Sequence, residues 1–471
     1  MGRQKFVRIK WIFGLLIIYF VGGLFIPHLF PPAKQERPDA TVHLMKRWEE
    51  DDSRTVTDCV QIISEAEAAL SVRLAMIREA EKELDLTYFS FTNFDCGNAI
   101  LSEVIHAADR GVQVRLMVDG KMGMLKNSTK RMLSRHPNIQ VASYNPIRLW
   151  RPWTLNEVLH DKFMIVDHRY ALLGGRNIQS HYFGIDDDPA RTKHDWDIFL
   201  YNSESLPGES IIDALIAYND QLWQTPETKV FHSHKEDLTP LADIHREAHR
   251  FAEQYPYFYE KSLTDFTSEM ITPNRIMLLH NPLQAGRKDP WIAQDLASLT
   301  AKAEQSLFVQ TPYATAAPIL LEFLDQTEKR VPVTFLTNSL GSAANMPAYS
   351  NYHFQKRLFL STGMDIYEYQ GEDSIHGKSL VIDERIVIVG SFNLDSRSVF
   401  LDTETMLVID SPEFAKIFMT ERDRFMTHSL PVDPDRRYFP QHAVLEGDVS
   451  LRKYLLYRMV YFLLRPFQYF V

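Results

Sequence analysis

A pattern that occurs twice constrains this 471-residue chain more than any other feature. Residues 160–167 read H-x-K-x4-D, and residues 376–383 read the same. After each copy come a glycine and an asparagine at matched offsets, and then an acidic residue. These are Gly174, Asn177 and Asp195 after the first copy, and Gly390, Asn393 and Glu404 after the second. One copy could be a strand histidine beside a surface lysine, but two full copies indicate an internal duplication around a shared site.

Predicted helices and strands alternate in both halves of the chain. In the first half, a helix over 71–83 leads into a strand over 84–91, and a helix over 100–111 leads into a strand over 113–119. Strands over 306–312 and 331–338 repeat this order, each after a helix. Such alternation is typical of βαβ units. The sequence therefore predicts an α/β fold of two duplicated halves, each a mostly parallel sheet flanked by helices, with an N-terminal transmembrane helix.

The same patterns divide the chain into six segments. We expect a membrane anchor over 1–30, a linker over 31–57, a first half over 58–224, a connecting segment over 225–280, a second half over 281–448 and a basic-aromatic tail over 449–471.

The N-terminus combines an apolar run with a basic flank. Residues 11–29 contain no Asp, Glu, Lys or Arg, and a membrane-spanning helix needs about 20 such residues. The residues ahead of the run include Arg3, Lys5, Arg8 and Lys10. The positive-inside rule then predicts a single-pass anchor in the cytoplasmic (inner) membrane, with the catalytic body outside the cytoplasm. A cleaved signal peptide is the rival, but no small-x-small cleavage pattern follows the run. A buried core helix is the other alternative.

The net charge and the cysteine content argue against several classes of protein. The net charge of -10 and the pI of about 5.9 argue against a protein that binds nucleic acid in bulk, because such proteins usually carry a basic field. Two cysteines exclude a disulfide framework and a cysteine-rich zinc site. Cys59 and Cys96 could form one disulfide outside the cytoplasm, or be two independent buried thiols.

The duplicated residues suit chemistry at a phosphate. Histidine and lysine two apart on a strand project from the same face. Lysines and asparagine amides neutralise and bind phosphoryl oxygens, one histidine attacks phosphorus, and the other protonates the leaving oxygen. An acidic residue against the far ring nitrogen fixes the tautomer. Because the lysines supply the positive charge, we expect neither a metal nor a cofactor. The predicted site comprises His160, Lys162, Asp167, His376, Lys378 and Asp383, supported by Asn177, Asn393, Asp195 and Glu404.

These residues carry a resemblance that covers nearly everything from residue 58 onward. The segments RGVQVRLMVDG (110–120), LLGGRNIQSHYFG (172–184) and HGKSLVIDERIVIVGSFNLDSRSVFLDTE (376–404) resemble the phospholipase D superfamily, the HKD enzymes. Their layout is similar to bacterial cardiolipin synthases, especially the C type. The resemblance implies a phosphatidyl-histidine intermediate with His160 as the nucleophile, and structural support from Asp167 and Asp383. Asp402 stands where such synthases often carry asparagine.

The resemblance also implies a substrate class. It favours a phosphatidyltransferase acting on membrane phospholipids, with phosphatidylglycerol as the leading candidate and phosphatidylethanolamine as a further one. A hydrolytic phospholipase D would use the same intermediate with water as acceptor. A phosphodiesterase acting on nucleic acid is disfavoured by the acidic pI and the predicted anchor. A non-catalytic membrane scaffold is disfavoured by the two intact motifs.

Two further segments suggest contact with a membrane surface. Residues 450–471 contain four basic residues, many aromatic residues and no acidic residue, as expected of an interfacial helix on anionic lipid. A helix docked on the domain is the alternative. The segment LWRPW (149–153) could lie at the same interface, or pack over the mouth of the site.

Overall fold

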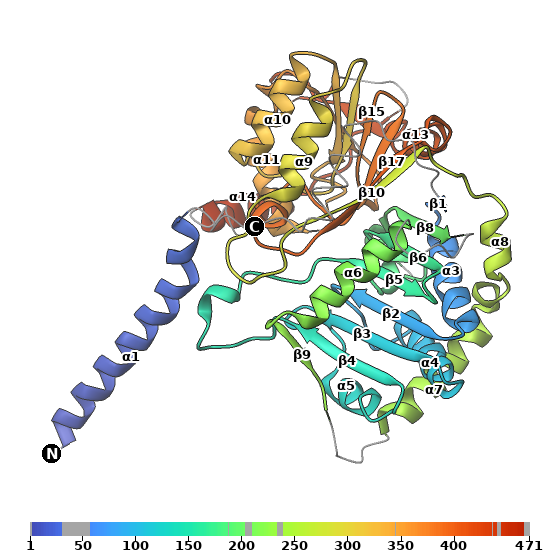
Figure 1. The fold of residues 1–471 in the computed structure, drawn as a ribbon. Coiled ribbons are helices and arrows are strands. Elements are labelled where there is room, and N and C mark those ends of the chain that lie inside the picture. The colour runs from blue at the N-terminus through green and yellow to red at the C-terminus, as the bar shows by residue number, and fades with distance from the viewer. Residues whose placement is uncertain are drawn as a thin grey trace.

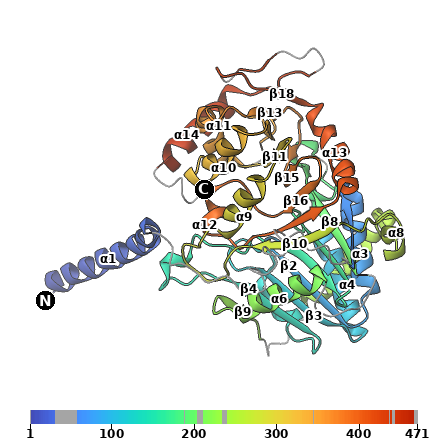
Figure 2. The same cartoon turned by 45° about the horizontal axis from the view of Figure 1, so that its top comes forward.

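Two α/β halves form the body of the protein, and helix α1 (Gly2–Phe25) projects from it in two different views (Figure 1, Figure 2). The computed structural model describes residues 2–30, 57–186, 188–202, 210–232, 239–343, 345–435, 437–439 and 444–465. Most of the predicted linker, residues 31–56, lies outside the described residues, as do residues 466–471 of the predicted tail.

The first half is built on an eight-stranded sheet of order β1-β8-β6-β5-β2-β3-β4-β9. Its strands are β1 (Asp58–Ile63), β2 (Glu83–Tyr88), β3 (Gln113–Asp119), β4 (Ile139–Tyr144), β5 (Lys162–Val166), β6 (Tyr170–Gly174), β8 (Asp197–Asn202) and β9 (Thr228–Val230). Its helices are α3 (Ala66–Glu79), α4 (Cys96–Asp109), α5 (Asn127–Leu133), α6 (Ile211–Gln224), α7 (Thr239–Gln254) and α8 (Leu263–Thr267).

The second half repeats the order, as β10-β17-β16-β15-β11-β12-β13-β18. Its strands are β10 (Arg275–His280), β11 (Leu307–Gln310), β12 (Val333–Asn338), β13 (Asp365–Tyr369), β15 (Lys378–Ile382), β16 (Ile386–Gly390), β17 (Thr405–Asp410) and β18 (Ser429–Pro431). Its helices are α9 (Trp291–Thr300), α10 (Pro318–Glu328), α11 (Met346–Leu360), α12 (Ser396–Phe400), α13 (Pro412–Met426) and α14 (Leu451–Leu464). The segment predicted as a connection, 225–280, contributes β9 to the first sheet and β10 to the second.

Both sheets are mixed, so the prediction of mostly parallel sheets is wrong. Within the two eight-stranded sheets, only β2, β3 and β4, and their counterparts β11, β12 and β13, pair in parallel. Helical crossovers join these strands, as parallel pairing requires. The motif strand β5 continues through a short hairpin into β6, and β15 continues likewise into β16, so these strands pair antiparallel.

Each hairpin begins at the aspartate of the motif. The turn residues Asp167 and His168 have φ of 54° and 56°, and Asp383 and Glu384 have φ of 55° and 51°. A left-handed backbone is costly for most residues, although aspartate tolerates it better than most. The two turns therefore have the same strained geometry at equivalent positions.

Apolar side chains join the two halves. One cluster packs α3 and α4 on the first sheet, and a second packs α9, α10 and α11 on the second sheet. A third cluster contains residues of both halves, including Phe163 of β5, Phe308 of β11 and Val381 of β15, together with side chains of α6 and α13. This shared core places both motif strands at the interface between the halves.

Helix α1 and the 3-10 turn Ile26–Leu29 contain the predicted anchor. Large apolar side chains along α1 are exposed, among them Trp11, Leu15 and Ile18. No helix within the described part of the chain is long and apolar enough to cross a membrane. The single-pass anchor therefore stays a prediction.

Helix α14 docks on the second half by one face. Tyr457 is buried and donates its hydroxyl hydrogen to the Ala343 carbonyl at 3.1 Å, while Leu455, Met459 and Phe462 are exposed. Contact of this exposed face with lipid stays a prediction. Cys59 and Cys96 are both free thiols, so the structure contains no disulfide between them.

Candidate active site

The segment that carries His160 is held by the second half. Residues 158–160 precede β5 and run parallel to the chain around Thr403, which precedes β17. The His160 N–H donates to the Thr403 carbonyl at 3.2 Å, and the Thr403 N–H donates to the Val158 carbonyl at 3.1 Å. The second half thus fixes the backbone on which the first histidine stands.

The segment that carries His376 is held in the same way by the first half. Strand β14 (Ser374–Ile375) pairs in parallel with β7 (Lys193–His194), which precedes β8. The His376 N–H donates to the His194 carbonyl at 2.6 Å. These two crossings bring both histidines to the interface between the halves.

Each imidazole also pairs with a carboxylate of the opposite half. The Nδ1 of His160 lies 2.9 Å from Oε1 and 3.0 Å from Oε2 of Glu404. The Nδ1 of His376 lies 2.5 Å from Oδ2 of Asp195. A neutral imidazole that donates its Nδ1–H in this way keeps an unprotonated Nε2, which can act as a nucleophile or base. Sequence reasoning placed each acid in the group of its own half and missed this exchange.

The carboxylates are themselves oriented by hydrogen bonds. The Ser391 and Ser398 hydroxyls donate to Glu404 at 2.5 and 2.6 Å, and the Trp196 N–H donates to Asp195 at 2.8 Å. Burial raises the pKa of Glu404, and the charge of the nearby Lys162 opposes that shift. Burial, followed by the charge of the adjacent motif lysine, holds the pKa of both His160 and His376 well below the ordinary value.

The two lysines lie beside the histidines and are almost fully buried. The Nζ of each donates to the carbonyl of the histidine two residues earlier, and Lys378 Nζ also lies 2.8 Å from His376 Nδ1. Burial lowers the pKa of Lys162 to about 8 and that of Lys378 to about 7. Each lysine also lowers the pKa of the opposite half's histidine, so the four groups share one site.

The two asparagines follow β6 and β16 and are nearly buried. Asn177 accepts the Ser90 N–H at 3.1 Å with Oδ1, and its Nδ2 lies 3.4 Å from the Tyr182 hydroxyl. The buried Oδ1 of Asn393 has no hydrogen-bond partner in the described part of the chain. The glycine that ends β16 is required by close packing, because a Cβ on Gly390 would stand 2.2 Å from the Thr405 carbonyl.

The structure does not bring Asp167 and Asp383 to the histidines. Asp167 accepts the backbone N–H groups of residues 81–83 at 2.7–2.8 Å, beyond the far end of β5. Asp383 accepts those of residues 304–306, beyond the far end of β15. Each carboxylate thus connects the hairpin turn in which it stands to a second segment of its own half.

Three aromatic residues flank the histidines and were missed in the sequence. The Phe89 ring centroid lies 5.2 Å from that of His160. The Tyr182 and Tyr313 centroids lie 5.3 and 5.9 Å from that of His376, and the Tyr182 hydroxyl lies 3.4 Å from His376 Nε2. Tyr182 follows Asn177 closely in the sequence, but aromatic residues are common enough that this gave no distinct signal.

The site consists of two carboxylate-bound histidines and two buried lysines between duplicated α/β halves. This arrangement defines a class of proteins in which two similar halves share a single histidine–lysine site. The chain belongs to the family described as "Cardiolipin synthase, PLD-like domain", within the phospholipase D superfamily. The profile of that family matches residues 74–206 and 296–426, which is one copy in each half.

Individual relatives agree with this family. Cardiolipin synthase C of Escherichia coli K12 is 26% identical over 387 residues, which cover 74% of this chain and 80% of that protein. An uncharacterized protein of Helicobacter pylori strain J99 is 25% identical over 397 residues, covering 74% and 75%. The crystal structure of phosphatidylserine synthase from Haemophilus influenzae Rd KW20 shares the fold, with a TM-score of 0.61 and 15% identity over 91% of this chain and all of that one.

Proposed function

We propose that this protein is a cardiolipin synthase-like phosphatidyltransferase that works through a phosphatidyl-histidine intermediate. The observation that carries the proposal is the pair of histidines, each with Nδ1 on a buried carboxylate and each beside a buried lysine. A site of this kind presents two Nε2 atoms and two ammonium groups to a single phosphodiester. The similarity to cardiolipin synthase C supports a phospholipid as that phosphodiester.

The proposed reaction has two steps. In the first, Nε2 of His160 attacks phosphorus, the bond from phosphorus to the leaving alcohol breaks, and protonated His376 gives its proton to the leaving oxygen. In the second, His376 takes the proton of an acceptor alcohol, whose oxygen attacks phosphorus and releases His160. Lys162, Lys378 and the asparagine amides bind the phosphoryl oxygens throughout.

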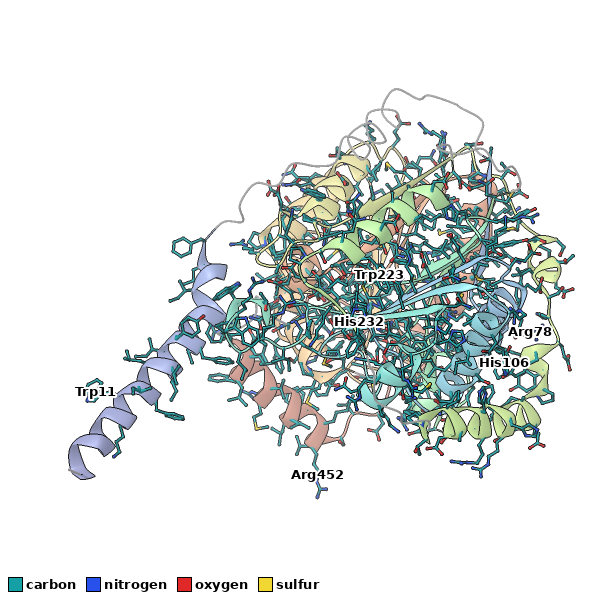
Figure 3. The ribbon with its side chains drawn as sticks, turned by 60° about the horizontal axis from the view of Figure 1, so that its bottom comes forward. Trp11, Arg78, His106, Trp223, His232 and Arg452 are labelled. Carbon is teal, nitrogen blue, oxygen red and sulfur yellow. The ribbon has the colours of Figure 1, made fainter. Side chains whose placement is uncertain are left out.

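The proposed donor and acceptor are membrane phospholipids, with phosphatidylglycerol in both roles and phosphatidylethanolamine as a second donor. The exposed apolar residues support a membrane location. Ile147, Leu149 and Trp150 are exposed on the loop that precedes the first motif, and the Tyr19 hydroxyl of α1 donates to the Trp150 carbonyl at 2.7 Å. Figure 3 shows Trp11 on the projecting helix α1, and Arg452 on α14 at the lower edge of the body.

Lipid mass spectrometry tests the proposal directly. The purified full-length protein is incubated with phosphatidylglycerol vesicles, with and without added glycerol. We expect cardiolipin to form and glycerol to reverse the reaction. Phosphatidic acid as the sole product would assign the protein as a hydrolase instead, and cleavage of nucleic acid without lipid turnover would assign it as a nuclease.

Histidine variants connect that activity to the site. His160→Ala and His376→Ala should each lower turnover by at least ~10²–10⁴-fold, the contribution of positioned acid–base groups alone. The matched control is His106→Ala, which removes a half-exposed histidine of α4, remote from α1 and α14 in Figure 3, and should leave turnover unchanged. Near wild-type activity in a folded variant of either site histidine would contradict the assignment.

A further inference from the structure

One position breaks the equivalence of the two halves beside the histidines. Lys193 stands two residues before Asp195, and Asp402 stands two residues before Glu404. Each stands just before the acidic residue that pairs with the histidine of the opposite half. The pseudo-twofold arrangement thus places a cation on the His376 side and an anion at the corresponding position on the His160 side.

Asp402 is held within the protein through its Oδ1. It is buried, its Oδ1 accepts the Val158 N–H at 3.2 Å, and the same atom pairs with the Arg397 guanidinium at 3.1 Å. It therefore holds the segment that carries His160, and its charge is paired with Arg397.

Lys193 differs from Asp402 in its burial and in its partners. It is half-buried on β7, and no carboxylate lies within ion-pair distance of its Nζ in the described part of the chain. Its Nζ lies 5.3 Å from the centroid of the Tyr182 ring, whose hydroxyl is 3.4 Å from His376 Nε2. The Tyr182 side chain thus contacts both the Lys193 ammonium group and His376 Nε2, the nitrogen that exchanges a proton with the alcohol in the proposed reaction.

Three carboxylates on or beside the segment that contains β7 pair with groups other than Lys193. Asp195 binds His376, Asp186 pairs with Arg191 at 3.5 Å, and Asp373 binds His194 at 2.6 Å. Burial lowers the pKa of Lys193 to about 8, against the attraction of Asp195, so most of the amine is charged at neutral pH. Burial and the nearby Lys193 and Arg191 also lower the pKa of His181 to about 3, so that ring is neutral.

The proposed reaction assigns a role to this cation. Both the alcohol that leaves and the alcohol that enters react at His376. When the entering alcohol is the glycerol headgroup of phosphatidylglycerol, its own phosphodiester lies only a few bonds from the attacking oxygen. We propose that Lys193 binds the phosphodiester of the acceptor lipid, and so favours an anionic glycerophospholipid over neutral glycerol or water. This inference rests on the proposed function.

The experiment measures how the phosphatidyl-enzyme partitions between acceptors. Vesicles of phosphatidylglycerol are incubated with the full-length protein and deuterated glycerol, and mass spectrometry measures cardiolipin, heavy phosphatidylglycerol and phosphatidic acid. All three products derive from one intermediate. Their ratio therefore reports the acceptor step alone and does not depend on how fast the intermediate forms.

We expect Lys193→Met to lower the ratio of cardiolipin to heavy phosphatidylglycerol by ~10–100-fold, the range for loss of a hydrogen bond to a charged group. Lys193→Arg should largely restore the ratio. Arg191→Gln removes a neighbouring exposed charge and should leave the ratio unchanged, which separates a bound phosphodiester from general attraction to the vesicle.

Three outcomes would overturn the inference. They are an unchanged ratio in Lys193→Met, an equal fall in Arg191→Gln, and a wild-type protein that makes heavy phosphatidylglycerol but no cardiolipin. The last would leave the transferase activity standing. Phosphatidic acid as the sole wild-type product would instead remove the proposed function, and this inference with it.

Discussion

At the scale of residues, the surroundings of His160 and His376 favour the neutral imidazole. Burial and the adjacent lysines both disfavour the protonated ring, and the carboxylates of Glu404 and Asp195 accept the Nδ1–H. The Nε2 lone pairs are then available near neutral pH. The neutral state suits His160 as the nucleophile and His376 as the base of the second step. In the first step His376 must carry a proton, and the negative charge of a bound phosphodiester favours that form.

The exchange of carboxylates gives a prediction specific to each step. With a donor whose leaving group needs no protonation, such as a p-nitrophenyl phosphodiester, Glu404→Gln should slow formation of the His160 adduct by ~10²–10⁴-fold. Glutamine keeps an acceptor oxygen but loses the negative charge, and its NH2 group favours the wrong tautomer of the ring. Asp195→Asn should leave adduct formation intact and slow its breakdown. Rapid quenching with mass spectrometry of the adduct measures both steps. The reverse pattern would assign each acid to the histidine of its own half.

The lysines predict a loss of activity at alkaline pH. Each ammonium is charged below its pKa, about 8 for Lys162 and about 7 for Lys378, and becomes neutral as the pH rises through those values. Since a bound phosphodiester stabilises the charged form, kcat/KM should fall at lower pH than kcat. In Lys378→Arg the lower break should disappear, because guanidinium stays charged. A flat kcat/KM profile for the wild-type protein from about pH 6 to 9 would refute this.

Most of the site could be predicted from residue types and offsets, but its connectivity could not. The matched spacing of Asn177 and Asn393 after the histidines identified both loops. Nothing in a linear pattern states that Glu404 reaches His160, because that contact depends on how the two halves pack. Lys193 was missed for a related reason, since a single lysine in a sequence gives no sign that it faces a site.

At the scale of elements, the hairpin turns after β5 and β15 depend on one carboxylate each. The backbone of Asp383 has a φ of 55°, and its carboxylate accepts three consecutive backbone N–H groups. Asp383→Ala should lower the free energy of unfolding by about 1–2 kcal/mol, while the folded fraction keeps near wild-type kcat. Asp383→Asn should lower the free energy of unfolding by less, because asparagine tolerates this left-handed backbone and keeps one acceptor oxygen in its side chain. Urea denaturation, with Asp423→Ala on the surface of α13 as control, measures the effect.

The same hairpins explain why the sheets were predicted as mostly parallel. The crossovers through α4 and α5 follow the expected alternation, and the strand predicted over 113–119 coincides with β3. Strands β5 and β6 are buried almost throughout, so they lack the alternation that marks a half-exposed antiparallel strand. Their turn, Asp-His-Arg, contains neither glycine nor asparagine and gives no hairpin signal.

At the scale of the whole molecule, the basic flank ahead of residues 11–29 predicts the orientation in the membrane. A reporter fused after Val471 should show active alkaline phosphatase and dark green fluorescent protein, because the body is expected outside the cytoplasm. Replacing Arg3, Lys5, Arg8 and Lys10 by glutamine should weaken that bias. The opposite reporter pattern would place the body in the cytoplasm, and N-terminal sequencing of the purified protein tests whether the apolar run is retained or cleaved.

The exchange of carboxylates between the halves also bears on how such a chain can evolve. A site in which each half completes the histidine of the other has the geometry of an isologous dimer. In a true homodimer every substitution appears twice, so a lysine gained beside one histidine is gained beside both. Fusion into one chain removes that constraint. Lys193 and Asp402 can then differ, so that only one of the two equivalent positions carries a cation.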